Sequence, residues 1–148
     1  MIRVQADDFD MGAEIARLTK GDTSVGGVCA FAGLVRDFAG KDGTMTLEHY
    51  PGMTEKALAE IEAEALSRWS LTGTLIIHRY GRLEPGDQIV LVAAASAHRQ
   101  AAFDACHFLI DWLKTKAPFW KQEESDGSTR RIDAKTSDNA AVEKWAKE

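Results

Sequence analysis

The chain has 148 residues, of which 45% are hydrophobic and 28% are charged, a balance typical of a globular domain. This composition excludes collagen, coiled coils and wholesale disorder, and no stretch reaches the ~18 apolar residues that a membrane span needs. The 18 Lys and Arg residues against 23 Asp and Glu residues give a formal net charge of −5. We therefore do not expect a general nucleic-acid-binding protein, because such domains are usually basic.

The first half of the chain predicts short strands around two helices. Apolar residues at helical spacing follow Asp10, a helix-capping residue type, and Gly21 ends this pattern. A second helical stripe consists of Leu58, Ile61 and Ala65. In chain order we expect a strand over Ile2–Gln5, the first helix, a strand over Val25–Leu34, a mobile loop over 37–44, a strand over Thr44–Tyr50 and the second helix over Thr54–Trp69.

The second half predicts two more strands, a long helix and a mixed tail. Pro118 ends the long helix, because a residue before proline avoids the α region. We expect strands over Thr74–Tyr80 and Gln88–Ala95 joined by a turn at Glu84–Asp87, then a helix capped by Ser96 that runs from Ala97 to about Lys116 with an apolar stripe of Phe103, Cys106, Ile110 and Leu113. We then expect a polar loop over Glu124–Thr129, a strand over Arg130–Ala134 and a short helix capped by Ser137 that contains Trp145. The irregular order of strands and helices predicts an α+β fold rather than a doubly wound sheet.

The chain start and the two cysteines indicate a cytoplasmic protein. The first residues, MIRVQADDFD, lack the apolar run of a signal peptide. Cys29 and Cys106 form no CxxC motif and lie in apolar surroundings, so we interpret them as small buried residues in a reducing compartment. The alternative is a nucleophilic or sulfur-carrying cysteine, which needs an exposed and electropositive setting.

Two basic segments are candidates for a functional site. In KTKAPFWK, residues 114–121, the lysines are either a solvated helix end or a site in which apolar Phe119 and Trp120 partly desolvate Lys121 and suit it to acid–base chemistry. In SAHR, residues 96–99, a histidine and an arginine stand at a helix start, where cations are unfavourable. They therefore indicate a bound anion, or else an arginine paired with a nearby carboxylate. Arg36 is a weaker candidate for the same anion pocket.

The histidines carry no recognised motif. His49, His78, His98 and His107 lack the partners of a metal site, and a structural role is the stronger interpretation of His107 and Asp111, one helical turn apart. The sequence contains no GxGxxG, Walker, GxSxG or HExxH motif. We therefore expect neither a metal nor a cofactor.

Three blocks resemble the catalytic (large) subunit family of molybdopterin synthase. They are TLEHYPGMTEKALAEIEAEALSRW from Thr46, IHRYGRLEPGD from Ile77 and SAHRQAAFDACHFLIDWLKTKAPFWKQE from Ser96. They span much of residues 46–123, whereas the first 24 residues and those after Glu124 resemble the family only loosely. The resemblance implies one domain over 1–148 of the α/β-hammerhead type, with a mixed or antiparallel sheet and packed helices.

The resemblance also implies a reaction and a partner. The chain is expected to be a sulfurtransferase of molybdenum cofactor biosynthesis that acts as a homodimer. Each subunit would bind a small ubiquitin-like sulfur-carrier subunit, whose C-terminal Gly-Gly carries a thiocarboxylate, to give a heterotetramer. Two sulfur atoms would pass to cyclic pyranopterin monophosphate and make the dithiolene of molybdopterin.

Site roles are carried over from the family motif. Lys114 and Lys121 match its catalytic lysines; we expect Lys114 to hold the partner's terminal carboxyl group and the substrate, and Lys121 to donate protons. The residues expected to bind substrate are Leu34, Val35, Arg36, His98, Arg99, Lys114, Lys121, Gln122 and Glu123. Leu34 stands at a position where the family motif often has Lys, and Lys135 stands where the family often has Arg. We therefore expect no bidentate phosphate contact from Lys135.

The helix spacing predicts a site shared between two subunits. Arg99 and Lys114 lie 15 residues apart in the predicted long helix, which corresponds to roughly 22 Å. A small pterin phosphate cannot reach both ends of one straight helix, so the two residues are expected to come from different copies. The alternatives to this enzyme are a non-catalytic dimeric adaptor that binds a ubiquitin-like tail or an anionic ligand, and a metal-dependent hydrolase.

Overall fold

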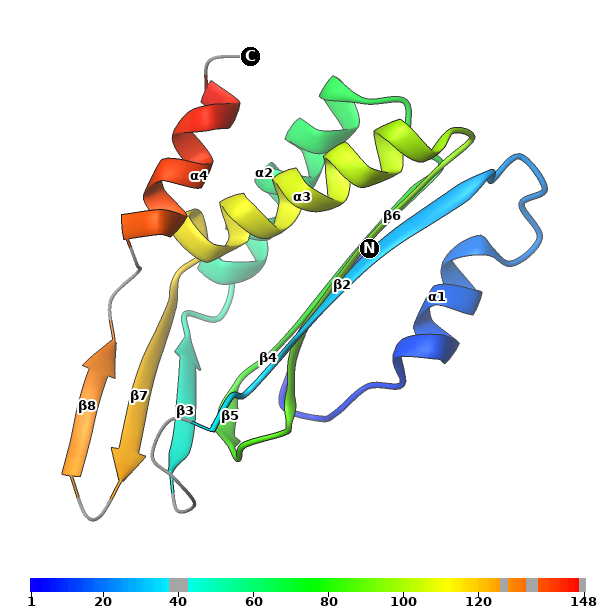
Figure 1. Ribbon diagram of the computed structural model, residues 1–148. Coiled ribbons are helices and arrows are strands. Elements are labelled where there is room, and N and C mark those ends of the chain that lie inside the picture. Colours follow the sequence, from blue (N-terminus) through cyan, green and yellow to red (C-terminus); the bar gives the residue numbers. More distant parts are fainter. Residues whose placement is uncertain (38–42, 126–127, 133–135, 147–148) are drawn as a thin grey trace.

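The computed structural model describes residues 1–37, 43–125, 128–132 and 136–146, which form four helices and two four-stranded sheets (Figure 1). The larger sheet has the order β1 (Ile2–Gln5), β4 (Gly73–Arg79), β6 (Gln88–Ser96), β2 (Gly27–Leu34), and the smaller sheet has the order β5 (Gly81–Leu83), β3 (Thr44–His49), β7 (Phe119–Ser125), β8 (Ser128–Ile132). The helices are α1 (Met11–Thr19), α2 (Met53–Arg68), α3 (Arg99–Lys116) and α4 (Thr136–Ala146). Only β1 and β4 pair in parallel among the described strand pairs, so the expected α+β class with a mixed sheet is confirmed.

Helices cover both faces of the larger sheet, α1 on one side and α2 with α3 on the other (Figure 1). Successive side chains of a strand point to opposite faces. Leu75 and Ile77 of β4 therefore pack with Phe9 near α1, whereas Ile76 packs in the main core with Phe108 of α3. The same alternation places His78, two residues after Ile76, on the α3 side of the sheet.

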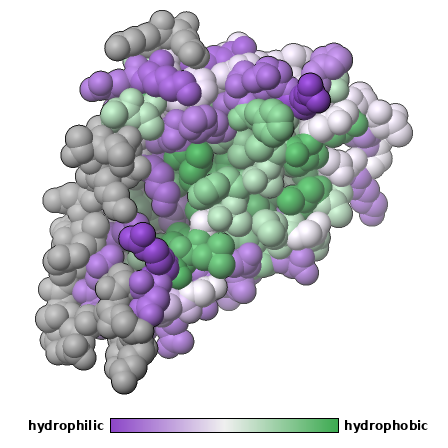
Figure 2. All heavy atoms as spheres, in the orientation of Figure 1, coloured by the Kyte–Doolittle hydropathy of each residue, from purple (hydrophilic) through white to green (hydrophobic). Residues whose placement is uncertain are grey.

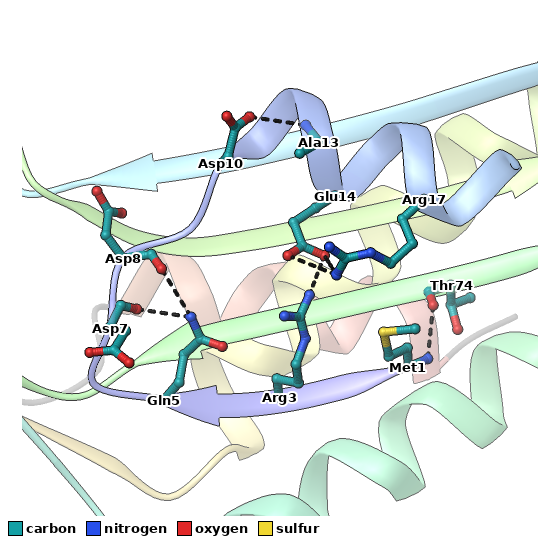
Figure 3. A network of polar contacts seen from close by, with 10 residues as sticks. All are labelled: Met1, Arg3, Gln5, Asp7, Asp8, Asp10, Ala13, Glu14, Arg17 and Thr74. Carbon is teal, nitrogen blue, oxygen red and sulfur yellow. Dashed lines mark hydrogen bonds and ion pairs between the residues drawn. The ribbon is translucent and has the colours of Figure 1, made fainter.

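A polar network fastens α1 to the edge of the larger sheet (Figure 3). Asp10 caps the helix by accepting from the Ala13 N–H at 2.9 Å, as the sequence predicts. The buried carboxylate of Glu14 pairs with Arg3 of β1 and with Arg17, whose Nη1 lies 3.2 Å away. The helix and β1 are thus joined by a partly desolvated ion pair rather than by apolar contacts alone.

The structure corrects the predicted start and face of the long helix. α3 begins at Arg99 with His98 as the N-cap, not after Ser96. Ser96 still belongs to β6 and is buried; its hydroxyl donates to the Ser70 carbonyl at 2.8 Å and accepts from the His98 N–H at 3.4 Å, a residue before the helix begins. Phe103 is also wrong as a core residue, because it is 54% exposed; Ala102, Ala105 and Leu109 face the sheet instead. Pro118 ends the helix as expected.

The other differences concern the smaller sheet. The prediction of a loop over Glu124–Thr129 is wrong at both ends, because β7 runs to Ser125 and β8 begins at Ser128. The strands β5 and β7 were not predicted. The terminal helix exists and contains Trp145 as expected, but Thr136 begins it, so Ser137 lies inside it rather than capping it. Trp145 is buried. Residues 38–42 of the expected mobile loop, and Lys135, lie outside the described residues.

Within the described residues, no helix is both long enough and apolar enough to cross a membrane.

Candidate active site

The candidate site lies where two segments of the chain enter the smaller sheet, one from the larger sheet and one from α3. One passage runs from β4 through Tyr80 into β5, where Gly81 adopts φ 98°, a conformation that favours glycine. The other runs from the end of α3 through Pro118 into β7. These two passages bring residues from distant parts of the sequence to one junction.

Lys114 and Lys121 stand on either side of the second passage, on α3 and β7, and both are half-buried. In the register of the smaller sheet, Lys121 lies opposite Leu47 and Glu123 lies opposite Met45. Leu47 and Met45 are buried core residues, and directly opposed residues share a face, so Lys121 and Glu123 lie on the inward face of the sheet.

Gln122 lies on the other face of β7. Its neighbours in the strand point inward, and its own side-chain amide donates to the Glu48 carboxylate at 3.4 Å. On the same face, Trp120 packs edge-on against Tyr50 with ring centroids 4.2 Å apart. Lys121, Gln122 and Glu123 were all predicted to bind substrate. Because side chains alternate along a strand, Lys121 and Glu123 face the junction and Gln122 does not.

His78 occupies the centre of the junction and was not among the predicted site residues. Its side chain is buried, with 3% of the residue exposed, and its ring stacks on Phe119 at 3.6 Å. Its Nδ1 lies 2.8 Å from the Arg79 carbonyl oxygen. Burial above all, and next the charges of Lys114, Lys121 and His49, lower the pKa of His78 from 6.5 to about 3, against the opposing effect of the Arg79 carbonyl.

We call His49, His78, Lys114 and Lys121 the lysine–histidine cluster. His49 enters it from the end of β3, where its ring lies 4.2 Å from that of Tyr80 and its Nε2 lies 4.0 Å from the Glu55 carboxylate. The cluster combines two ammonium groups with an imidazole that stays neutral. Such an arrangement can bind an anion and can supply or accept protons.

The predicted residues Leu34, Val35 and Arg36, at and just after the end of β2, lie at the same end of the larger sheet as His78. Leu34 pairs with Gln88 on one side of β6, and His78 pairs with Val90 on the other side. Leu34 is 53% exposed and Arg36 is exposed. Val35 differs: its side chain lies in the core, and its backbone bonds Asp87 and Gly86, each at 2.8 Å.

His98 and Arg99 lie at the opposite end of α3 from Lys114. The helix is continuous from Arg99 to Lys116, so the separation of roughly 22 Å expected from helical rise applies. Both residues are exposed, and none of the ion pairs found among the described residues includes Arg99. One chain therefore does not bring Arg99 to the lysine–histidine cluster.

The cysteines and the remaining histidine pair have structural surroundings. Burial and the neighbouring Cys29 raise the pKa of the Cys106 thiol to about 12, which disfavours the reactive thiolate. His107 lies 3.3 Å from Asp111, whose carboxylate also accepts from the Trp145 indole N–H at 2.7 Å. Among the described residues, no group of three or more His, Cys, Asp or Glu side chains could hold a metal ion.

Comparison with known proteins identifies the family. The model of the family described as "MoaE protein" matches residues 4–116. The chain belongs to the MoaE family. It is 55% identical to the molybdopterin synthase catalytic subunit of Pseudomonas aeruginosa over 146 residues, covering 97% of each chain, and 53% identical to that of Mesorhizobium japonicum, covering 97% of this chain and 92% of the relative.

Solved structures agree with this family. The MoaE protein from Burkholderia ambifaria has 49% identity and a TM-score of 0.87, and the match covers 100% of this chain and 99% of that one. The expected mixed α+β fold is therefore that of solved MoaE structures. A complex of subunits 1 and 2 of molybdopterin-converting factor from Helicobacter pylori shares the fold, with a TM-score of 0.71 and 20% identity over 91% of this chain and 90% of that one.

Proposed function

We propose that the chain is the catalytic subunit of a cytoplasmic molybdopterin synthase. In this role it transfers two sulfur atoms from the thiocarboxylated Gly-Gly end of a small ubiquitin-like subunit to cyclic pyranopterin monophosphate. Family membership over almost the whole chain supports the reaction class. The observation that carries the site is the meeting of Lys114 and Lys121 beside a neutral His78 at the junction of the two sheets.

The lysine–histidine cluster suits this chemistry. The phosphate and the thiocarboxylate are both anions, and an ammonium group binds and neutralises each of them. Sulfur transfer and opening of the cyclic phosphate both need proton transfer and stabilisation of developing charge. We assign binding of the partner's terminal carboxyl group and substrate to Lys114, and proton donation to Lys121.

The partner is the small sulfur-carrier subunit, and its tail enters in an extended form. The Helicobacter pylori structure similar in fold is a complex of subunits 1 and 2 of molybdopterin-converting factor, which supports a second subunit as the partner. A tail that ends in Gly-Gly passes a narrow channel without the clashes of a Cβ atom. With two copies of each subunit, the assembly is a heterotetramer.

A second copy of this chain completes the site. β2 is an edge strand of the larger sheet, and Val28, Phe31 and Leu34 on it are exposed. Figure 2 shows hydrophobic atoms gathered along the diagonal that β2 follows in Figure 1. An apolar edge strand of this length is a template for pairing with another strand. We assign this edge to the contact between two copies.

A two-fold contact along β2 brings the separated residues together. The β2 strands of two copies then run antiparallel, so the Gly27 end of one lies beside the Leu34 end of the other. Arg99 belongs to the first end, because a Cβ atom on Gly27 would lie 3.6 Å from its Cα. Arg99 of one copy thereby approaches the junction that holds Lys114 of the other.

Reconstitution tests the proposed function. We expect dithiolene product when the protein is mixed with thiocarboxylated small subunit and cyclic pyranopterin monophosphate, and none when the small subunit carries an ordinary carboxylate. A small subunit that ends in Ala-Ala is expected to react poorly. Binding of both components without product would contradict the enzyme and favour the adaptor.

A further inference from the structure

His78 has a position that the roles assigned so far do not explain. It lies in β4, after the buried Ile76 and Ile77, yet it is a polar residue at the end of the α3-facing side of the sheet. The charged or titratable groups that act on it come from three elements: Lys114 of α3, Lys121 of β7 and His49 of β3. The charges of the two lysines proposed to do the chemistry therefore act on the ring, and Phe119, on which the ring stacks, lies on the same face of β7 as Lys121.

Two contacts fix the orientation of the ring. Phe119 stacks on it with ring planes inclined by only 16°, so the imidazole plane cannot tilt freely. The Arg79 carbonyl oxygen lies 2.8 Å from Nδ1. A carbonyl oxygen only accepts hydrogen bonds, so Nδ1 carries the proton and donates it.

The protonation of the second nitrogen follows from the first. A neutral imidazole holds one N–H, so the hydrogen on Nδ1 leaves Nε2 with a free lone pair, which is a hydrogen-bond acceptor. An ammonium group has three donors and no acceptor. A neutral Nε2 is thus a complementary neighbour for a lysine, whereas a protonated ring would add a third positive charge to the same junction.

We propose that His78 is a positioning residue for the two lysines. Its Nε2 accepts a hydrogen bond from an ammonium group of the pair Lys114 and Lys121 and holds the pair at the junction without adding charge. The ring is held by Phe119 and Arg79 and is the fixed point of the arrangement. This inference rests on the proposed function, because it concerns the same lysines.

Three substitutions separate the features of the ring. In His78→Gln the amide oxygen reaches the position of Nε2 and keeps an acceptor there. In His78→Asn the amide takes the position of Nδ1 and keeps the donor toward the Arg79 carbonyl, but loses the acceptor. His78→Phe keeps only the stack on Phe119.

We expect kcat for dithiolene formation to fall about ten- to a hundred-fold in His78→Asn and His78→Phe, the usual effect of removing a hydrogen bond to a charged group. KM should change little, and His78→Gln should recover most of the lost kcat. Thermal unfolding of each variant, measured in parallel, identifies losses caused by the fold alone. Equal losses of kcat in all three variants that follow their thermal stability would overturn the proposal.

Nuclear magnetic resonance of the ¹⁵N-labelled protein gives a readout that does not depend on activity. The Nε2 of His78 should remain unprotonated across about pH 5–8. The Nζ signals of Lys114 and Lys121 should shift in His78→Asn and less in His78→Gln, while the exposed Lys116 serves as the control. Unchanged lysine signals in His78→Asn overturn the proposal. Failure of the wild-type protein to make product overturns the proposed function instead, and the lysine signals still decide the role of His78.

Discussion

At the scale of single residues, the two ammonium groups of the junction share their surroundings with one neutral imidazole. Folding removes the water that would stabilise a charged His78, and the neighbouring lysines oppose that charge as well. The same burial that suits His78 to its place therefore makes the folded protein sensitive to acid.

The first prediction concerns this sensitivity. Because folding lowers the pKa of His78 from 6.5 to about 3, the unfolded chain binds a proton below pH 6.5 that the folded chain does not bind. The contribution of His78 to stability is fully present above pH 6.5 and is lost as the pH falls toward 3, by up to about 1.4 kcal/mol per pH unit. Urea unfolding at about pH 7.5 and 5 should show a larger loss of stability in the wild type than in His78→Gln.

The control for this measurement is His107→Gln, since His107 is largely exposed. Its stability should follow that of the wild type across the same pH range. If stability depends on pH in the same way in the wild type and in His78→Gln, His78 is not the cause of the acid sensitivity.

The second prediction concerns the two lysines. Lys114→Ala and Lys121→Ala should each reduce the rate of product formation by at least about a hundred-fold, the lower end of what general acid–base groups contribute, with the fold retained. Lys116→Ala is the matched control, because Lys116 is exposed on the same helix and rests over the Trp112 ring at 5.4 Å. Near-normal turnover in both site variants would refute the assignment.

The third prediction concerns anion binding at the start of α3. Arg99→Ala should weaken substrate binding about ten- to a hundred-fold, because a contact to a charged group contributes about 1.5–3 kcal/mol. Isothermal titration calorimetry with cyclic pyranopterin monophosphate measures this loss of affinity. Gln100→Ala is the control, since that side chain bonds Asp104 within the same helix at 3.0 Å. Equal affinity of Arg99→Ala and the wild type would count against this role.

At the scale of elements, the approach of β2 to the segment before α3 depends on a glycine. A Cβ atom on Gly26 would lie 2.0 Å from the Ala97 carbonyl oxygen, a backbone atom that cannot move aside by itself. The Gly26 N–H also donates to the Ser96 carbonyl at 2.9 Å. This contact sets where His98 and Arg99 stand.

The fourth prediction follows from this contact. Gly26→Ala should destabilise the protein by about 1–3 kcal/mol, as overpacking does, and should weaken substrate binding by displacing Arg99. Gly12→Ala is the matched control, because its Cβ would meet only Asp10 Oδ1 at an ordinary 3.5 Å, and alanine favours the helix by up to about 1 kcal/mol. Chemical denaturation measures the free energy of unfolding of the two variants. A Gly26→Ala protein that is as stable as the wild type would rule out the close approach.

The elements that the sequence predicted are those with local signals. The Asp10 cap and Pro118 mark helix ends through interactions within a few residues, and the structure has both. β7 lacked such a signal, because its pairing with β3 and β8 decides its conformation and its sequence mixes aromatic with charged residues. Phe103 was misplaced because apolar residues surround α3, so periodicity alone did not select the face toward the sheet.

The site was predicted only in part for a similar reason. The motif around Lys114 and Lys121 is local and could be recognised. His78 could not, since Lys114, Phe119 and Lys121 lie more than thirty residues away from it in the sequence and a lone histidine in an apolar strand is more often structural. The single useful signal was a polar residue at the end of the unbroken apolar run Leu75–Ile77.

At the scale of the whole molecule, the fifth prediction concerns the site shared between copies. Arg99→Ala and Lys121→Ala proteins should each have little activity alone when the substrate is well below saturation, and a hybrid dimer of the two should regain one intact site of its two. Activity after exchange of differently tagged subunits measures this recovery. Inactive hybrids, once verified by the tags, or full activity in a monomer, would refute the shared site.

Because α3 is one unbroken helix, the effect of two mutations depends on whether the same subunit carries both. In the proposed dimer each helix serves two sites, giving its lysine end to one and its arginine end to the other. Two substitutions, one at each end, therefore complement each other when different subunits carry them. When one subunit carries both, it inactivates both sites of any dimer that it joins. A cell that expresses such a double variant beside the normal chain would show a dominant loss of activity, although each single change is recessive.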